Sequence, residues 1–396
     1  MIKTEYYKDL TKMNTFGMKV KARCFMEYDS VADLVDIEFE ELARPVLHIG
    51  GGSNLLFTDD FKGTVLHSRI NFIEILDECQ CAAVAPSHSV GPSPYPGVGK
   101  CHFRTNGTSS EDVDSTDAGT KNAPEVVLVS VGAGVVFDDF CDWAAKEGLW
   151  GVENLSYIPG EVGASAVQNI GAYGVEVKDV IRKVYCYDTQ EEEFVNFDVS
   201  ECGYGYRDSI FKNPEIKGRY IVTHVVFALS REPQPRLDYG HLRDAVYCQS
   251  DQAQRAEKSL TPALIRKVII GIRKEKLPEP SVTGSAGSFF KNPVVAREHF
   301  ARIEAEAKAE LGAEYKVPHY DLPDGTVKIP AAWMIEQCGW KGRRSGGAAV
   351  YEKQPLVIVN YTGEAYPEEI IGLEKRIIES VKKKFGIDLH PEVEHI

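Results

Sequence analysis

The spacing of apolar and polar residues predicts alternating helices and strands along most of the chain. Residues 31–42 have apolar positions at helical spacing and follow Asp29-Ser30, a pair that can cap a helix N-terminus. A strand is expected next, over residues 45–49. The same patterns predict strands over residues 126–131, 181–189 and 218–229, and helices over residues 137–147, 262–274 and 300–311.

The clearest helical pattern lies near the C-terminus, over residues 368–385. Its apolar residues recur at helical spacing, Pro367 stands at its start, and Gly386 follows its end. Such a helix would deliver the last ten residues of the chain to one place. Well before it, a proline-punctuated segment at residues 276–280 indicates a domain boundary.

One long segment lacks these patterns. Residues 77–125 are rich in Pro, Ser, Thr and Gly, so they cannot bury enough apolar surface to offset the entropy of ordering. We expect an extended loop or a hairpin insertion there, on which no chemistry depends. Cys79, Cys81, Cys101 and His102 lie in this segment, but their spacing fits no standard zinc pattern and we expect no metal.

Composition and charge narrow the class of protein. A chain of 396 residues is longer than one core usually serves, so two or three domains are expected. The net charge of -14 argues against nucleic-acid and acidic-membrane partners, because phosphate-rich surfaces attract Lys and Arg. No apolar run is long enough to span a bilayer and the N-terminus has no signal-peptide pattern, so we expect a cytoplasmic protein. We also expect a monomer. Its nine cysteines are expected to be reduced.

The strongest candidate for a ligand site is the glycine-rich stretch at residues 156–174. It contains no lysine or arginine, and its glycines let the main chain approach a ligand closely and donate N–H groups. A tight turn between packed elements is the alternative. The length of the run and the side-chain amides of Gln168 and Asn169 favour a ligand site.

A second candidate follows the strand predicted over residues 45–49. That strand runs directly into three glycines, Ser53 and Asn54. Bare main-chain amides suit a phosphate, and the Ser and Asn side chains can cap it. The run is neither a Walker loop nor Gly-x-Gly-x-x-Gly, and a plain turn remains an alternative.

Single polar residues suggest acid–base and anion chemistry. Arg207 lies in a loop dense in Tyr, Arg and Lys, where its planar fork suits a carboxylate or an enolate; a surface salt bridge is the alternative. Ser288 lacks the Gly-x-Ser-x-Gly pattern of hydrolase nucleophiles, but it could donate a proton to a ligand. Residues 340–344 supply the basic patch that a diphosphate needs in an acidic protein.

Five segments together carry a resemblance to a known family. They are residues 158–174, 206–212, 287–295, 346–350 and 391–393, which follow one another in the family's order. The chain resembles the UDP-N-acetylenolpyruvoylglucosamine reductases of bacterial cell-wall synthesis over nearly its whole length, except residues 77–125. Leu237-Asp238-Tyr239-Gly240 resembles the mobile tyrosine loop of the longer subclass.

The resemblance implies an α+β fold of three domains. It predicts two FAD-binding domains of the vanillyl-alcohol oxidase type, over residues 1–70 and 71–277, and a C-terminal α+β substrate domain over residues 278–386. Residues 387–396 are expected to return to the first domain. Longer family members continue past this point, so their extra tail is expected to be absent.

The resemblance also implies a reaction. NADPH would reduce FAD, and hydride from flavin N5 would then reduce the enolpyruvyl ether of UDP-N-acetylglucosamine to UDP-N-acetylmuramate, for peptidoglycan synthesis, cell shape and cell division. The family's catalytic residues fall on Arg207, Ser288 and Glu392. Arg207 would stabilise the enolate, Ser288 would protonate carbon, and Glu392 would hydrogen-bond the intermediate or relay a proton. Without the resemblance, Glu392 would be taken for a solvated tail residue.

Two larger sets of residues follow from the same resemblance. The residues expected to hold FAD are Gly50, Gly51, Gly52, Ser53, Asn54, Ile158, Pro159, Gly160, Gly163, Ala164, Ser165, Gln168, Asn169, Gly171, Ala172, Gly174 and Arg273. The residues expected to bind the substrate are Tyr206, Tyr239, Lys276, Asn292, Tyr320, Lys341 and Gln354.

Two other functions stay open at this point. An oxidase of the same flavin superfamily would leave Arg207, Ser288 and Glu392 without an evident task, and would show rapid reoxidation of reduced flavin by air. A catalytically silent flavin- or nucleotide-binding protein would retain flavin without consuming NADPH.

Overall fold

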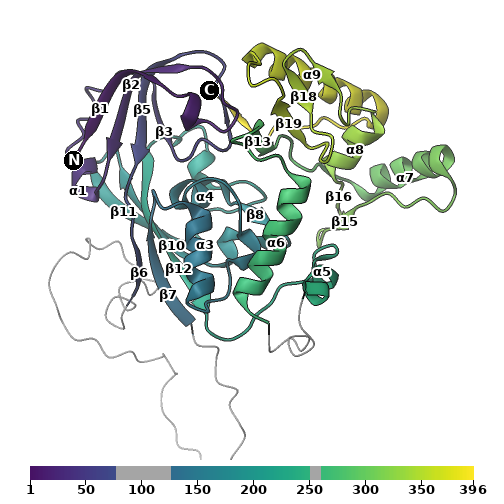
Figure 1. Cartoon of the computed structure of the whole chain (residues 1–396), viewed down its shortest axis with the longest axis horizontal. Helices are drawn as coiled ribbons and strands as arrows, with labels where there is room; N and C mark the ends of the chain where they lie inside the picture. Colours follow the sequence, from purple (N-terminus) through teal and green to yellow (C-terminus); the bar gives the residue numbers. More distant parts are fainter. Residues whose placement is uncertain (77–125, 250–259) are drawn as a thin grey trace, which may run out of the picture. The chain divides into compact units, whose positions relative to one another are not determined.

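The computed structural model describes residues 1–76, 126–249 and 260–396, which form two compact units (Figure 1). The first unit comprises Met1–Ile2, Glu27–Glu40 and His67–Ile270, and the second comprises Lys3–Met26, Glu41–Leu66 and Gly271–Ile396. The insertion predicted over residues 77–125, with its cysteines, lies outside the described residues. The division into three domains stays a prediction.

The first unit is built on a five-stranded antiparallel sheet with the strand order β11-β10-β12-β7-β6. The strands are β6 (Ile73–Ile75), β7 (Val126–Gly132), β10 (Ile181–Asp188), β11 (Glu193–Asp198) and β12 (Tyr220–Ser230). The strands predicted over residues 126–131, 181–189 and 218–229 are therefore confirmed. The edge strands β6 and β11 were not predicted.

The helices of the first unit are α1 (Val31–Val35), α3 (Phe137–Lys146), α4 (Val162–Gln168), α5 (Leu242–Gln249) and most of α6 (Pro262–Lys276), and the hairpin strands β8 (Gly171–Ala172) and β9 (Val175–Glu176) follow α4. Of these helices, α3 and α4 pack against the sheet (Figure 1). The aromatic rings of Phe140 in α3 and Phe227 in β12 lie 4.7 Å apart in the core. The predicted helices over residues 137–147 and 262–274 are confirmed.

The prediction of a helix over residues 31–42 is correct only for residues 31–35. Its start is as expected, because the Ser30 hydroxyl accepts a hydrogen bond from the Asp33 N–H at 3.1 Å. However, α1 ends at Val35. Ile37 and Phe39 are both buried, so their apolar spacing reflects packing of an irregular segment rather than a helix.

The second unit contains two four-stranded sheets, ordered β1-β2-β5-β3 and β13-β19-β18-β17. The first has β1 (Lys3–Asp9), β2 (Lys21–Tyr28), β3 (Val46–Ile49) and β5 (Phe61–Ser68); the ends of β2 and β5 belong to the first unit. The second has β13 (Gly284–Ser288), β17 (Arg344–Ser345), β18 (Ala348–Val350) and β19 (Val357–Asn360). The strand predicted over residues 45–49 is confirmed.

One hydrophobic core joins these sheets and their helices, from Phe16 to Phe289 and Val393. The helices are α7 (Arg297–Leu311), α8 (Ala331–Gln337) and α9 (Pro367–Phe385), and the smaller strands are β4 (Leu55–Leu56), β14 (Val294–Val295), β15 (Tyr320–Asp321), β16 (Val327–Lys328) and β20 (Glu394–His395). The C-terminal helix is confirmed together with its left-handed cap, because Gly386 has φ +69°. It leads the chain to β20, which pairs in parallel with β4.

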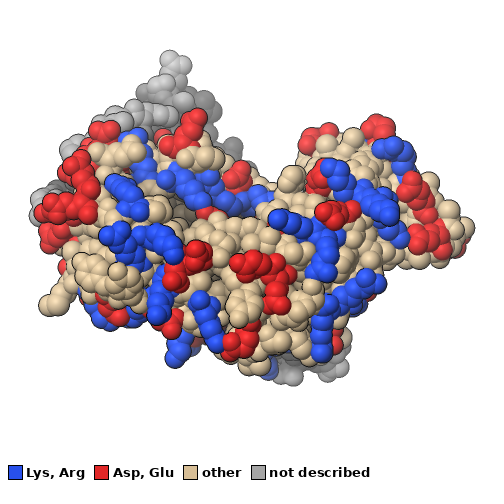
Figure 2. Space-filling view, turned by 90° about the horizontal axis from the view of Figure 1, so that it is seen from above, with Lys and Arg blue, Asp and Glu red and all other residues tan. Residues whose placement is uncertain are grey.

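Across the described ranges, we find no helix that combines the length and the apolar character needed to cross a bilayer. Figure 2 shows basic and acidic side chains interspersed over one face, so neither sign of charge covers that face alone.

Candidate functional site

The glycine-rich stretch enters the first unit through a strained residue. Tyr157 adopts a left-handed backbone with φ +61°, which a side chain larger than glycine rarely adopts. Its N–H donates to the Asp138 carboxylate of α3 at 2.5 Å, and the same carboxylate is paired with the Arg266 guanidinium of α6. A short network between two helices therefore fixes the start of the stretch.

The middle of the stretch is the short helix α4, and Asn169 ends it with a left-handed φ of +48°. Asn169 is fully buried; its side chain donates to the Gly205 carbonyl at 2.7 Å and accepts from the Lys178 N–H at 3.2 Å. This side chain thus joins the segment before β10 to the loop after β11. Gln168 accepts from the Lys212 ammonium at 2.7 Å.

Arg207 is brought against the glycine-rich stretch. It lies in the turn closed by the bridge between Gly205 and Asp208, also with a left-handed φ of +56°. Its guanidinium donates to the Gly171 carbonyl at 2.5 Å and to the Asn169 carbonyl at 3.4 Å. A Cβ on Gly171 would lie 2.8 Å from the same guanidinium, so the close approach requires glycine. Main-chain carbonyls therefore orient this cation.

The tyrosine loop contacts the same stretch. The ring of Tyr239 lies 6.0 Å from that of Tyr173 at an interplanar angle of 81°. Fully buried Asn154 connects the two segments, because its amide donates to the Tyr173 carbonyl at 3.0 Å and to the Arg236 carbonyl at 2.8 Å. Sequence reasoning missed Asn154, since a lone Asn between Glu153 and Leu155 carries no recognisable pattern.

In the second unit, Ser288 and Glu392 are brought to neighbouring segments. Glu392 donates its N–H to the Phe289 carbonyl at 2.8 Å, and Lys291 donates to the His390 carbonyl at 2.9 Å. Ser288 is exposed and follows Gly287, which has a left-handed φ of +68°. The two predicted catalytic residues of this unit, far apart in the sequence, thus flank one short ladder of main-chain hydrogen bonds.

The predicted phosphate-binding run reaches the same tail. The Asn54 side chain donates to the Glu392 carbonyl at 3.1 Å, and Glu394 donates its N–H to the Asn54 carbonyl at 2.9 Å. Gly52 is left-handed with φ +60°, and a Cβ there would lie 1.9 Å from the Met13 carbonyl oxygen. The run is therefore a tightly packed glycine turn that also holds the C-terminal segment.

The remaining predicted substrate residues lie on separate elements. Asn292 accepts from the Ala331 N–H at the start of α8, at 2.9 Å, and Lys341 pairs with Glu336 at 2.7 Å. Tyr320 lies in β15, and Gln354 precedes β19.

Arg273 and Lys276 lie in the last turns of α6, which continues two residues beyond its predicted end. Tyr206 stacks beside Arg207, with 5.4 Å from the ring to the guanidinium carbon.

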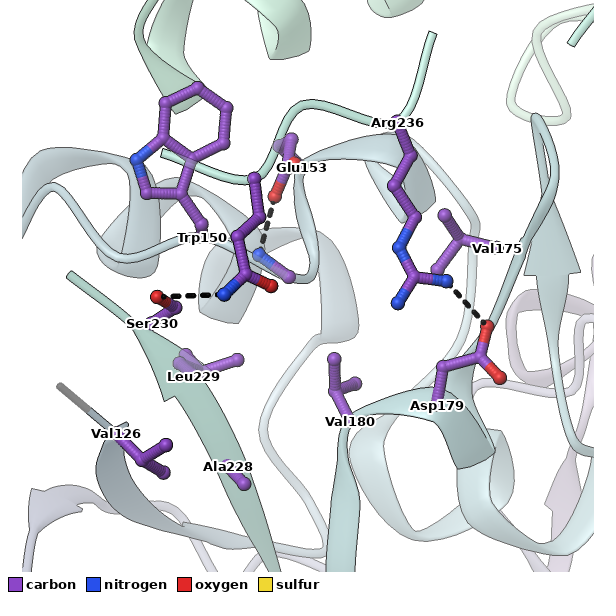
Figure 3. A pocket seen from close by; sticks show the side chains of 12 residues that line it. Val126, Trp150, Glu153, Val175, Asp179, Val180, Ala228, Leu229, Ser230 and Arg236 are labelled. Carbon is purple, nitrogen blue, oxygen red and sulfur yellow. Dashed lines mark hydrogen bonds and ion pairs between the residues drawn. The ribbon is translucent and has the colours of Figure 1, made fainter. Parts of the chain in front are cut away.

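The first unit contains a cavity of about 110 Å³, and Figure 3 shows the side chains that line it. It is lined by Val126, Trp150, Gly151, Glu153, Val175, Asp179, Val180, Ala228, Leu229, Ser230, Gln234 and Arg236. None of the predicted site residues lines it. Burial raises the pKa of the Glu153 carboxyl, which accepts from the Gly151 N–H at 2.7 Å. This carboxyl stabilises the local loop.

Comparison with known proteins identifies the class. Residues 120–197 match the FAD binding domain family, and residues 279–396 match the C-terminal domain of UDP-N-acetylenolpyruvoylglucosamine reductase. Together with the glycine-rich stretch and its oriented arginine, these matches define an FAD-binding oxidoreductase.

Whole-chain relatives identify the family. The chain is 46% identical over 390 residues to the UDP-N-acetylenolpyruvoylglucosamine reductase of Bacteroides fragilis strain YCH46, which covers 98% of each chain. It is 40% identical over 392 residues to that of Porphyromonas gingivalis strain ATCC 33277, which covers 98% of this chain and 97% of the relative. The chain therefore belongs to the UDP-N-acetylenolpyruvoylglucosamine reductase family, and the predicted family is confirmed.

A solved structure supports the fold. The crystal structure of the UDP-N-acetylenolpyruvylglucosamine reductase of Thermus caldophilus matches with a TM-score of 0.57 at 20% identity, covering 100% of this chain and 98% of that one. The predicted α+β class is confirmed.

Proposed function

We propose that this chain catalyses the NADPH-dependent reduction of UDP-N-acetylenolpyruvoylglucosamine to UDP-N-acetylmuramate in peptidoglycan precursor synthesis. Family membership supports the reaction. The structural observation that carries the proposed chemistry is the ladder between residues 289–291 and 390–392, because it holds Ser288 and Glu392 on neighbouring segments. We further propose a monomer that works in the cytoplasm.

The residues present fit FAD. Gly50, Gly51, Gly52, Ser53 and Asn54 offer main-chain amides, a hydroxyl and a side-chain amide, and no carboxylate that would repel a pyrophosphate. In the first unit, α4 and its flanking turns carry the other proposed FAD ligands, between Ile158 and Gly174. When bound, FAD supplies the hydride that reduces the substrate, and NADPH restores it.

Arg207 is the proposed electrostatic stabiliser of the enolate. A cation contributes most when it is already oriented as charge develops, because no reorganisation is then needed during the reaction. The carbonyls of Gly171 and Asn169 provide that orientation, because both accept hydrogen bonds from the guanidinium.

Ser288 is the proposed proton donor to carbon. A hydroxyl is a weak acid, but an enolate carbon is basic enough to take its proton when the two are held in contact. Gly287 gives the main chain the left-handed turn that precedes Ser288. Glu392 is proposed to hydrogen-bond the intermediate or to replenish the proton, in a position fixed by the Phe289 carbonyl.

The purified protein, loaded with FAD, tests this proposal in two half-reactions. We expect NADPH to remove the visible flavin absorbance, and the enolpyruvyl substrate to restore it under anaerobic conditions. In Ser288→Ala the first step should be unchanged and the second slowed by at least about a hundredfold, the usual scale for losing a general acid. Ser281→Ala, an exposed serine of the same unit, is the matched control.

Three outcomes would oppose the proposal. Substrate turnover by Ser288→Ala at the wild-type rate would exclude that residue as the proton donor. Rapid reoxidation by air without substrate would favour an oxidase. Retention of flavin without consumption of NADPH would favour a silent binding protein.

A further inference from the structure

A buried histidine lies between two carboxylates next to the glycine-rich stretch. His67, at the end of β5, has its Nδ1 atom 3.0 Å from Glu27 Oε1 and its Nε2 atom 2.9 Å from Glu161 Oε1. The side chains are 7% exposed for His67, 19% for Glu27 and 11% for Glu161. All three belong to the first unit.

This geometry favours the imidazolium form of His67. A carboxylate oxygen only accepts hydrogen bonds, whereas a neutral imidazole has one donor and one acceptor nitrogen. Two carboxylates can therefore both be satisfied only by the imidazolium form, in which both nitrogens donate. A neutral His67 would place a lone pair against one buried carboxylate, which is costly.

The other groups around the cluster leave this requirement in place. Arg69 has its Nη1 atom 4.0 Å from Glu27 Oε1, and it is 60% exposed, so solvent screens most of its charge. The Tyr28 phenol hydrogen-bonds to Ser68, and the nearby Glu161 charge helps to raise the pKa of this phenol. Glu161 and Glu27 are the charged groups that shift the pKa of His67.

Glu161 connects this cluster to the proposed FAD segment. It is the N-cap residue of α4 and lies between Gly160 and Val162, with Gly163 one residue further on. Its main chain is paired with Val136, and its carbonyl accepts from the Ser165 N–H at 2.9 Å. The carboxylate is thus the side-chain anchor of the turn that carries Gly160 and Gly163.

We propose that His67 is a positioning residue. Its imidazolium, clamped between Glu27 and Glu161, holds residues 160–163 in the conformation that binds FAD. As rising pH removes the second imidazole proton of His67, the affinity for FAD falls. The proposal rests on the proposed function only in that FAD occupies this segment.

The direction of the pH effect follows from the cluster. Burial lowers the pKa of His67, but Glu161 and then Glu27 raise it by more, so the pKa of His67 lies above its ordinary value of 6.5. The clamp is therefore complete below pH 6.5 and is lost as the pH rises through the higher folded-state pKa.

The test measures the dissociation constant of FAD from the full-length protein between pH 6 and 9, without NADPH or substrate. Fluorescence of released FAD provides the readout, and a melting temperature at each pH confirms folding. For the wild type we expect the dissociation constant of FAD to rise about tenfold across this range. A tenfold change corresponds to one pKa unit of coupling between protonation of His67 and binding of FAD.

Two variants separate positioning from bulk structure. In Glu161→Gln the new amide donates to a neutral His67, which can still donate to Glu27, so FAD binding should become independent of pH. His67→Gln should bind FAD about tenfold more weakly at pH 6 and also lose the pH dependence. His224→Gln is the matched control, because burial lowers the pKa of this histidine of the same unit to about 4, so it stays neutral across the range.

The results separate this proposal from the proposed function. A wild-type constant that does not change with pH, or a Glu161→Gln profile identical to the wild type, would overturn the role of His67 even if substrate is reduced normally. A pH-dependent constant that Glu161→Gln flattens would support the clamp even if the substrate proves to be a different one.

Discussion

Removal of the Asn54 side chain tests whether the glycine run at residues 50–54 also positions Glu392. In Asn54→Ala the hydrogen bond from the amide to the Glu392 carbonyl, 3.1 Å long, is lost. One such bond contributes about 1 kcal/mol to folding. The ladder to Phe289 remains, so we expect the protein to fold with its free energy of unfolding lowered by about that amount.

Asn54→Ala should affect the rate of the second half-reaction more strongly than it affects the free energy of unfolding. A misplacement of about 1 Å can cost roughly a hundredfold in rate, so we expect the reoxidation of reduced flavin by substrate to slow by about ten- to a hundredfold. Because Asn54 is also proposed to contact FAD, flavin content is measured first and FAD is kept in excess. Reduction by NADPH, which does not use Glu392, should then proceed at the wild-type rate.

Thr58→Val provides the control for a loosened tail. The Thr58 hydroxyl donates to the Ile396 carbonyl at 2.7 Å, so this variant also removes one hydrogen bond to the C-terminal segment, but not at Glu392. Unfolding in urea should show a similar loss of stability for both variants. Equal slowing of the second half-reaction in the two variants would refute the coupling between Asn54 and Glu392.

Two further predictions concern the first unit. Gly171→Ala would place a Cβ 2.8 Å from the Arg207 guanidinium and displace it, so substrate-driven reoxidation should slow by about tenfold or more. Because Gly171 is also proposed to contact FAD, flavin content is measured first and FAD is kept in excess; stopped-flow absorbance gives the rate, and an unchanged rate would contradict the prediction. Burial lowers the pKa of His224 from 6.5 to about 4. As the pH falls between these values, His224 is therefore protonated in the unfolded protein but not in the folded one, so the free energy of unfolding should fall by up to about 3 kcal/mol. Urea denaturation of His224→Gln should show a smaller loss over that range, and equal losses would oppose this account.

The sequence predicted the elements whose apolar pattern coincides with burial. In α9, Ile370, Ile377 and Val381 are all buried in the core, so the apolar residues at helical spacing are the ones that pack there. The strand β11 was missed because most of its residues are exposed or half-buried at the edge of the sheet, which leaves little apolar alternation to detect. Near Ile37 and Phe39, burial outside any helix produced a helical pattern and a wrong boundary.

The candidate site shows a different limit. Tyr157, Asn169, Tyr173 and Arg207 all have left-handed backbones although none is glycine, and all lie in or against the glycine-rich stretch. Such conformations cost about 1 to 3 kcal/mol each and persist only where surrounding contacts enforce them.

Those enforcing contacts come from residues distant in sequence. The Asp138 carboxylate holds the Tyr157 N–H, and the Asn154 amide holds the Tyr173 carbonyl. No local pattern in Asp138 or Asn154 signals a partner so far along the chain, which is why the sequence could suggest the glycines and Arg207 as candidates but not the residues that position them. Concentration of strained residues at one place is itself evidence for function, because a turn with no ligand to receive would gain stability by relaxing them. We therefore propose that the stretch at residues 156–174 is a preorganised binding surface rather than a packing turn.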